Sequence, residues 1–288
     1  MPTIALATAI PALALDDDMP PLIDACAAAG IDAMAVAWDD PTVSWQRFDA
    51  VLLRSTWNYM DRLDAFLHWC DRVARVTRLL NPPDVVRWNI DKRYLVTLAD
   101  AGVPVIDTHV VDSAAAFDAL PLLDEFVVKP SVGAGSRGAR RFVARQRRDA
   151  RAHALDLLAQ GGAVLVQPYL RKVDADGETA LLFFNGVYSH AIRKGPLLPE
   201  PGAASTDALF AAERITARQP SAAERALAEH VLTALPFTTP LYARVDLLPG
   251  SDGPRLLELE LIEPSVFLKH DTAAATRLVE ALQRVLPH

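Results

Sequence analysis

The segment that most restricts the fold of this chain lies near its end, between Leu241 and Pro264. Apolar and polar residues alternate there in two runs, 241–248 and 256–264, separated by residues rich in glycine and proline. Alternation with period two is typical of β-strands, and glycine and proline favour a turn between them. The segment is therefore predicted to form a β-hairpin.

The charged residues of this hairpin are expected to share one face. Glu258 and Glu260 are two apart and project from the same side of their strand, as Arg244 and Asp246 do on theirs. Clustered carboxylates repel one another unless a cation lies among them, and oxygen ligands suit Mg²⁺ bound to nucleotide phosphates. Two interpretations follow: a Mg²⁺ site formed by Asp246, Glu258 and Glu260, or a solvent-facing polar stripe.

The overall composition limits the classes of partner. A chain of 288 residues with a net charge of -7 can form a large core, and the negative charge argues against non-specific binding to nucleic acids or to membrane surfaces. No apolar run is long enough to span a bilayer. Cys26 and Cys70 both lie in apolar, helical contexts and are expected to be buried thiols rather than a disulfide. A cytoplasmic protein is expected.

The first 85 residues alternate between predicted strands and helices. Strands are expected at 4–9, 31–38 and 50–56, and helices at 20–29 and 62–79, which indicates a parallel sheet. Sites in such sheets lie at the carboxyl ends of the strands, where the third strand ends in a polar and aromatic cluster. The cluster is a candidate substrate site comprising Arg54, Ser55, Trp57, Asn58 and Tyr59. Alternatively, Arg54 forms a structural ion pair and the aromatic residues pack the loop.

A boundary is expected at residues 82–92, where two prolines precede a helix with Asn89 or Asp91 as its N-cap. Lys92 would then lie in the first turn of that helix, where the helix dipole does not favour a cation. Lys92 therefore either points at a bound anion or is an ordinary exposed lysine.

A glycine-rich loop follows the strand predicted at 125–129, which ends at Lys129. The glycines Gly133, Gly135 and Gly138 match the G-x-G-x-x-G pattern of dinucleotide-binding proteins, but that pattern requires a helix directly after the loop. Residues 139–144 alternate like a strand instead. The loop is therefore predicted to be a hairpin flap whose backbone N–H groups can cover phosphates.

The rest of the chain is expected to complete a nucleotide-binding unit. Further strands are predicted at 105–111, 163–167, 177–184 and 187–193, and helices at 113–120, 147–159, 222–235 and 272–286. The strand at 163–167 runs into Pro168, Tyr169 and Leu170, which could border a nucleotide base. Residues 195–219 are predicted to form a long mobile loop that acts as a lid.

The order of these motifs resembles that of the ATP-grasp ligases. Within them the chain is similar to glutathione synthetases, D-alanine–D-alanine ligases and the ligases that form cycloserine by cyclisation. The resemblance implies an α/β fold, α+β in its nucleotide part. It also implies an N-terminal parallel-sheet substrate domain at 1–85, a small subdomain with the flap at 86–166, and a central subdomain with the carboxylate hairpin at 167–288.

The resemblance also implies roles for individual residues toward ATP and Mg²⁺. Residues implied to contact ATP are Lys92, Lys129, Ser131, Gly133, Gly135, Ser136, Gly138, Gln167, Tyr169, Leu170 and Glu178. Asp246, Glu258 and Glu260 would hold Mg²⁺. The usual family pattern ends in Glu-x-Asn, so the glutamate at position 260 puts the number of Mg²⁺ ions in doubt. The catalytic candidates are Arg193, at the phosphates, and Arg244, at the oxyanion.

The implied reaction joins a carboxylate to an amine through an acyl phosphate and releases ADP and phosphate. The substrate would be a small amino-acid-like molecule, closed into a ring or joined to a second molecule. Ser265 and His270 are expected to complete its pocket, beyond the carboxylate hairpin. The family resemblance also implies a homodimer. The alternatives are a phosphotransferase on the same fold and a non-catalytic nucleotide-binding module.

Overall fold

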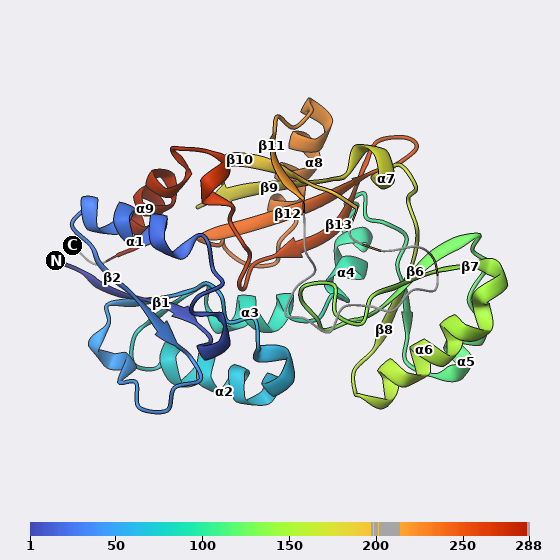
Figure 1. Ribbon diagram of the computed structural model, residues 1–288, viewed down its shortest axis with the longest axis horizontal. Helices are drawn as coiled ribbons and strands as arrows, with labels where there is room; N and C mark the ends of the chain where they lie inside the picture. Colours follow the sequence, from blue (N-terminus) through green and yellow to red (C-terminus); the bar gives the residue numbers. More distant parts are fainter. Residues whose placement is uncertain (197, 199–200, 202–213, 287–288) are drawn as a thin grey trace.

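The computed structural model describes residues 1–196, 198, 201 and 214–286. Three sheets form the framework of the molecule (Figure 1), and each contains strands that are close in the sequence. Most of the predicted loop at 195–219 lies outside the described residues. Its last part is not a loop, since Ile215–Arg218 forms a strand, β11, on the edge of the third sheet.

The N-terminal sheet is parallel, as expected, in the order β2-β1-β3-β4. Its elements are β1 (Thr3–Thr8), α1 (Met19–Ala28), β2 (Asp32–Ala37), β3 (Ala50–Leu53), α2 (Leu63–Ala74) and β4 (Arg78–Leu80), with short 3₁₀ turns at Ile10–Ala12, Trp45–Arg47 and Tyr59–Arg62. The helix predicted at 62–79 was too long, because its final residues form β4. A short apolar run fits either a helix or a buried strand, and pairing with β3 decides in favour of the strand.

The second sheet is antiparallel and carries the glycine-rich loop. Its strand order is β5-β8-β6-β7, and the loop joins β6 to β7. Its elements are β5 (His109–Val111), α5 (Ala114–Asp118), β6 (Glu125–Pro130), β7 (Arg140–Val143), α6 (Arg147–Ala159) and β8 (Val164–Pro168), with a 3₁₀ turn at Ala144–Gln146. The predicted hairpin flap is confirmed, and a strand rather than a helix follows the glycines.

The third and largest sheet is antiparallel in the order β11-β10-β9-β12-β13. Its strands are β9 (Glu178–Phe184), β10 (Val187–Lys194), β11, β12 (Tyr242–Pro249) and β13 (Pro254–Glu260). The predicted hairpin is confirmed as β12 and β13, in a register that places Arg244 opposite Glu260 and Asp246 opposite Glu258. The four charged residues therefore occupy neighbouring positions on one face of the sheet.

Helices from several parts of the chain pack around this central sheet. They are α3 (Pro83–Asn89), α4 (Tyr94–Asp100), α7 (Val173–Asp176), α8 (Ala222–Thr233) and α9 (Ala274–Val285), with a 3₁₀ turn at Leu268–His270. Helices α3 and α4 share an apolar cluster with β9, β12 and β13, and α9 packs beside α1 of the N-terminal part (Figure 1). The expected domain boundaries near residues 85 and 166 stay a prediction.

The segment around Lys92 differs from the prediction. Helix α3 begins at Pro83, and Lys92 precedes α4, which begins at Tyr94. Asn89 is not an N-cap, because its side chain hydrogen-bonds the backbone of β13 at Leu259 and Leu261. A proline is well suited to the first turn of a helix, so the second proline starts α3 rather than preceding it.

Both cysteines are buried free thiols, as expected. None of the helices in the described ranges combines the length and apolar character that a membrane crossing requires.

Candidate active site

Residues of the second and third sheets and of loops in the N-terminal part surround one cavity of about 520 Å³. The predicted site residues that line it are Trp57, Lys92, Lys129, Gly133, Gly135, Ser136, Gln167, Tyr169, Leu170, Glu178, Arg244, Asp246, Glu258, Glu260, Ser265 and His270. Those that do not line it are Arg54, Ser55, Asn58, Tyr59, Ser131, Gly138 and Arg193. Most of the proposed nucleotide residues therefore lie around the same cavity as the hairpin. Most of the cluster at 54–59 lies outside the lining of this cavity.

Two lysines project into the cavity from different elements. Lys92 lies 3.2 Å from a carboxylate oxygen of Glu258 and also contacts the carbonyl of Gly133 in the flap. Lys129 ends β6, and no residue in the described part of the chain forms a hydrogen bond or ion pair with its ammonium group. Burial lowers the pKa of Lys129 to about 8, and the charge of Lys92 adds to this effect, whereas Glu258 opposes it. Among the described residues, Lys129 is thus a buried cation that forms no ion pair, which favours binding of an anion.

The flap brings its backbone to the same wall of the cavity. Gly135 and Ser136 both have positive φ angles, of 60° and 61°, so the chain turns sharply there. Gly138 does not reach the cavity. A Cβ atom at this position would lie 3.2 Å from Pro130 and 3.3 Å from Leu157, so Gly138 serves the packing of the flap. Ser131 is fully buried, and its backbone binds Lys92 and Ala163.

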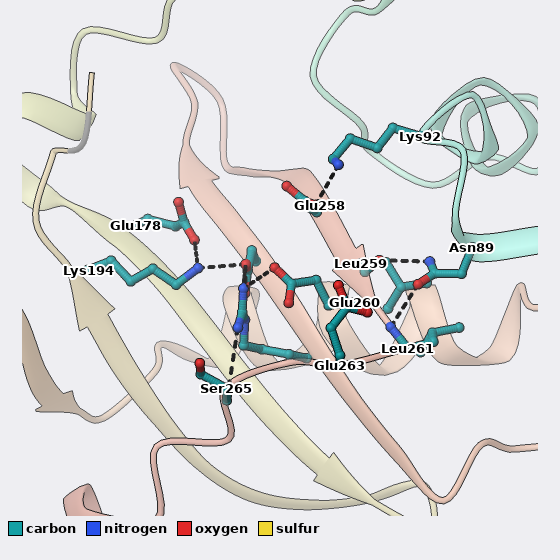
Figure 2. Close-up of polar contacts among 12 residues, drawn as sticks. Asn89, Lys92, Glu178, Lys194, Glu258, Leu259, Glu260, Leu261, Glu263 and Ser265 are labelled. Carbon is teal, nitrogen blue, oxygen red and sulfur yellow. Dashed lines mark hydrogen bonds and ion pairs between the residues drawn. The ribbon is translucent and has the colours of Figure 1, made fainter. Parts of the chain in front are cut away.

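The hairpin carboxylates are each engaged with cations (Figure 2). Asp246 is buried, and its oxygens accept hydrogen bonds from Lys194 at 2.7 Å and from Arg244 at 2.8–3.1 Å. Arg244 also pairs with Glu260 and donates to the carbonyl of Ser265. These cations hold the pKa of Asp246 below its usual range despite its burial.

The three carboxylates consequently do not form the open cluster that was expected. Within the ranges that the structure describes, no group of three His, Cys, Asp or Glu side chains is arranged to hold a metal ion. Glu258 and Glu260 retain side chains about a quarter exposed, at 24 % and 28 %, whereas that of Asp246 is only 2 % exposed. Two accessible carboxylates on one strand still match the needs of Mg²⁺, which takes its other ligands from phosphates and water.

Arg193, the cation expected at the phosphates, does not line the cavity, whereas its neighbour Lys194 does. Arg193 turns away from the cavity, and its guanidinium donates to the backbone carbonyls of Ala175 and Asp176. Lys194 faces the cavity and lies 2.6 Å from Glu178 and 2.7 Å from Asp246. Adjacent residues of a strand face opposite sides of the sheet. Lys194 is paired in register with Glu178 and shares its face, so Arg193 lies on the other face.

The wall at Gln167, Tyr169 and Leu170 follows the end of β8. Gln167 donates to the hydroxyl of Thr108 at 2.9 Å, and the guanidinium of Arg141 lies 3.6 Å from the ring centre of Tyr169. Both side chains are held in place before any ligand binds. Burial raises the pKa of nearby Glu178 to about 8 even beside Lys194.

Four members of the cluster at 54–59 do not line the cavity, and their direct substrate role stays a prediction. Arg54 is 1 % exposed and lies 3.6 Å from Asp18, and Ser55 donates to Thr8. Asn58 donates to Asp39 and accepts from Trp38, and Tyr59 is buried. Trp57 alone of the cluster lines the cavity.

Sequence reasoning missed the residues that hold the loop after β13. The carboxylate of Asp18 accepts backbone hydrogen bonds from Val266, Phe267 and Leu268 at 2.6–3.0 Å. His190 contacts the carbonyl of Val266 through Nε2. The loop therefore presents Ser265 and His270 to the cavity from a fixed position. Asp18 belongs to a run of three aspartates, which was the only signal that the sequence offered.

Comparisons with known proteins agree with this geometry. Residues 4–81 match the family model described as the N-terminal domain of D-cycloserine synthetase DcsG. The cycloserine biosynthesis protein DcsG of Streptomyces lavendulae is 44 % identical over all of both chains. The crystal structure of D-cycloserine synthetase DcsG superposes with a TM-score of 0.91, at 44 % identity, over 99 % of this chain and 100 % of the other.

The ATP-grasp ligase PsnB, solved with its minimal precursor, gives a TM-score of 0.65 at 20 % identity over 98 % of each chain. This more distant likeness identifies the fold. The chain therefore has the ATP-grasp fold, and its full-length similarity to DcsG shows that it belongs to the D-cycloserine synthetase DcsG family.

Proposed function

We propose that this protein closes a small amino-acid derivative into a ring by forming a C–N bond at the expense of ATP. The observation that carries the proposal is the cavity itself. It places an uncompensated buried lysine, Lys129, opposite a hairpin with accessible carboxylates, in a chain that is similar to D-cycloserine synthetase throughout its length.

In the proposed reaction, a carboxylate oxygen of the substrate attacks the γ-phosphorus of ATP. The bond from that phosphorus to the bridging oxygen breaks, ADP leaves, and an acyl phosphate forms. A nitrogen of the same molecule then attacks the carbonyl carbon, loses a proton, and displaces phosphate. Attack within one molecule has the advantage of proximity over attack by a second molecule.

Lys92, Lys129 and Lys194 are proposed to bind the phosphates. All three line the cavity, and their charges offset the negative charge of the nucleotide. The flap backbone at Gly133, Gly135 and Ser136 would cover the phosphates and exclude water, which otherwise hydrolyses an acyl phosphate. Gln167, Tyr169 and Leu170 are proposed to border the adenine, and Glu178 to accept from the ribose.

Glu258 and Glu260 are proposed to hold Mg²⁺, with Asp246 joining them only if Lys194 turns toward the phosphates. Bound Mg²⁺ would neutralise charge on the phosphate oxygens. The structure of PsnB has also been solved in complex with its minimal precursor, Mg and ADP. Arg244 lines the cavity beside these carboxylates and is proposed to stabilise the oxyanion of the second step.

ADP release provides the test. Candidate substrates that carry a carboxylate and a terminal nitrogen are incubated with ATP and Mg²⁺, and we expect ADP release that depends on one organic molecule alone. The Glu258→Gln variant is expected to lose at least about 100-fold in turnover, whereas Glu280→Gln, at an exposed position of α9, should match the wild type.

Three results would contradict parts of this proposal. Unchanged turnover in Glu258→Gln removes the metal assignment. A requirement for a separate amine replaces ring closure with intermolecular ligation. A stable phosphorylated product without C–N bond formation identifies a phosphotransferase. The homodimer expected from the family stays a prediction, which sedimentation would measure.

A further inference from the structure

Glu263 is a buried carboxylate that no assignment has used so far. It follows β13, lines the cavity and is 8 % exposed (Figure 2). The hydroxyl of Tyr59 hydrogen-bonds its carboxylate, and Nε1 of Trp57 donates to its backbone carbonyl at 3.1 Å. Two residues of the N-terminal part therefore hold both the side chain and the backbone of Glu263. Such double support is typical of a group whose position matters for binding.

Glu263 differs from the two glutamates before it in how its carboxylate is paired. Its neighbours on β13 have partners, since Glu258 pairs with Lys92 and Glu260 pairs with Arg244. Glu263 forms no ion pair with any cation in the ranges that the structure describes. The charged groups that act on it are Glu258 and Glu260, which repel it, and Lys92, which is committed to Glu258.

A cation that entered the cavity beside Glu263 would relieve this repulsion. Glu263 is buried and lies near two further glutamates, so a cation placed beside its carboxylate would be favoured. Mg²⁺ is already proposed to lie at Glu258 and Glu260, whose side chains are more accessible, which leaves Glu263 for a ligand of another kind. A substrate ammonium group needs only one carboxylate and a cavity.

We propose that Glu263 binds the α-ammonium group of the amino-acid-like substrate, with Tyr59 as the positioning residue that holds its carboxylate. The inference rests on the proposed function. An ammonium group beside a carboxylate keeps its proton, and a protonated amine is not a nucleophile. Glu263 thus makes the α-nitrogen unreactive, so that only the second nitrogen of the substrate attacks the acyl phosphate. Glu263 would in this way select ring closure over self-condensation.

Two ring compounds test the proposal directly. D-Cycloserine carries an amino group, and isoxazolidin-3-one is the same ring without it. Calorimetry with ADP and Mg²⁺ present measures the affinity of each compound. We expect the wild type to bind D-cycloserine at least about tenfold more tightly, because a charge-assisted hydrogen bond to the ammonium is lost in the other ring.

Glu263→Gln keeps the size of the side chain and an acceptor for Tyr59. In this variant the affinity for D-cycloserine should exceed that for isoxazolidin-3-one by less than about threefold. The control, Glu280→Gln, should retain the full preference. Turnover provides a second measurement, since Glu263→Gln should raise KM for the amino substrate more than it lowers kcat. Tyr59→Phe removes only the hydroxyl and should weaken the preference in the same direction, which keeps the test available if Glu263→Gln does not fold.

A preference that stays at tenfold or more in both variants would overturn the assignment to Glu263 while leaving the ligase proposal intact. A wild type that binds both rings equally would overturn it as well. A wild type that binds neither ring and releases no ADP with any candidate substrate would contradict the proposed function, and the inference with it.

Discussion

Two charged regions line the same cavity and differ in how their charge is balanced. Near the end of β6, the buried ammonium group of Lys129 forms no hydrogen bond or ion pair with any described residue. On the central sheet, Asp246 is buried between Lys194 and Arg244 and is bonded to both. The first region is incomplete without an anionic ligand, whereas the second is complete in the free protein.

This difference indicates which part of the site carries a stability cost. A buried charge without a partner destabilises the folded state, and removal of one member of a buried ion pair does so as well. Lys129 therefore reduces stability and favours ligand binding, as residues at functional sites often do. Asp246, by contrast, links β12 to β10 across the intervening strand β9, and a ligand has to compete for its partners.

Substitution of Asp246 should have the largest effect. Asp246→Asn leaves Lys194 and Arg244 without their common carboxylate, and we expect the free energy of unfolding to fall by about 4 kcal/mol. Urea denaturation measures the loss. The matched control is Asp252→Asn at the tip of the same hairpin, where the exposed pair with Arg255 should leave the midpoint unchanged. Equal stability of both variants would show that pairing at Asp246 does not stabilise the free protein.

Substitution of Lys129 should have the opposite sign. The pKa of Lys129 falls from 10.5 to about 8 on folding, so the unfolded chain binds more protons between these values. The cost of burying the ammonium is full below pH 8 and disappears as the pH rises to 10.5. Lys129→Met should therefore be more stable than the wild type at pH 7, by up to about 3 kcal/mol, and this advantage should shrink toward pH 10.5.

Thermal and urea unfolding of the two proteins across this pH range provide the measurement. Lys129→Met should also bind ATP at least about tenfold more weakly by calorimetry, because the phosphates lose a cation. If the Lys129→Met variant were less stable than the wild type at pH 7, the ammonium group would have a partner in solution. Unchanged ATP affinity would remove Lys129 from the phosphate site.

A third pair of variants compares adjacent residues of β10. Lys194→Met removes the cation that faces the cavity, and we expect turnover to fall by about 100-fold because phosphate charge loses a donor. Arg193→Met removes a side chain that binds the carbonyls of Ala175 and Asp176, and turnover should stay within about threefold of the wild type. ADP release measures both. The reverse order would restore the phosphate role first expected for Arg193.

Much of the fold could be predicted from local patterns. The period-two alternation of 241–264 predicted the β12–β13 hairpin, and the alternation after Gly138 separated a flap from a dinucleotide-binding helix. The prediction failed where local patterns are ambiguous. Residues 78–80 form a strand because β3 offers an edge for pairing, and nothing within the segment itself distinguishes it from the end of a helix.

The candidate site was predicted less completely, because charge balance depends on residues far apart in the sequence. Arg54 follows a strand, as substrate-binding residues often do, yet it lies against Asp18 behind the cavity wall. No local pattern marked Glu263 as a site residue. The residues that hold its backbone and its carboxylate, Trp57 and Tyr59, are about 200 positions away in the sequence. The sequence could have indicated that Lys194 rather than Arg193 faces the cavity. Side chains alternate along a strand, and Lys194 is the residue paired in register with Glu178.

Local periodicity and turn chemistry fix the order of the elements, the glycine flap and the face on which the hairpin charges lie, so these could be predicted from the residues alone. Which charges meet and which side chains reach the cavity depend on the folded arrangement of the chain. Ion pairs form between side chains of different elements, and their partners are fixed by packing and sheet register rather than by neighbouring residues in the chain.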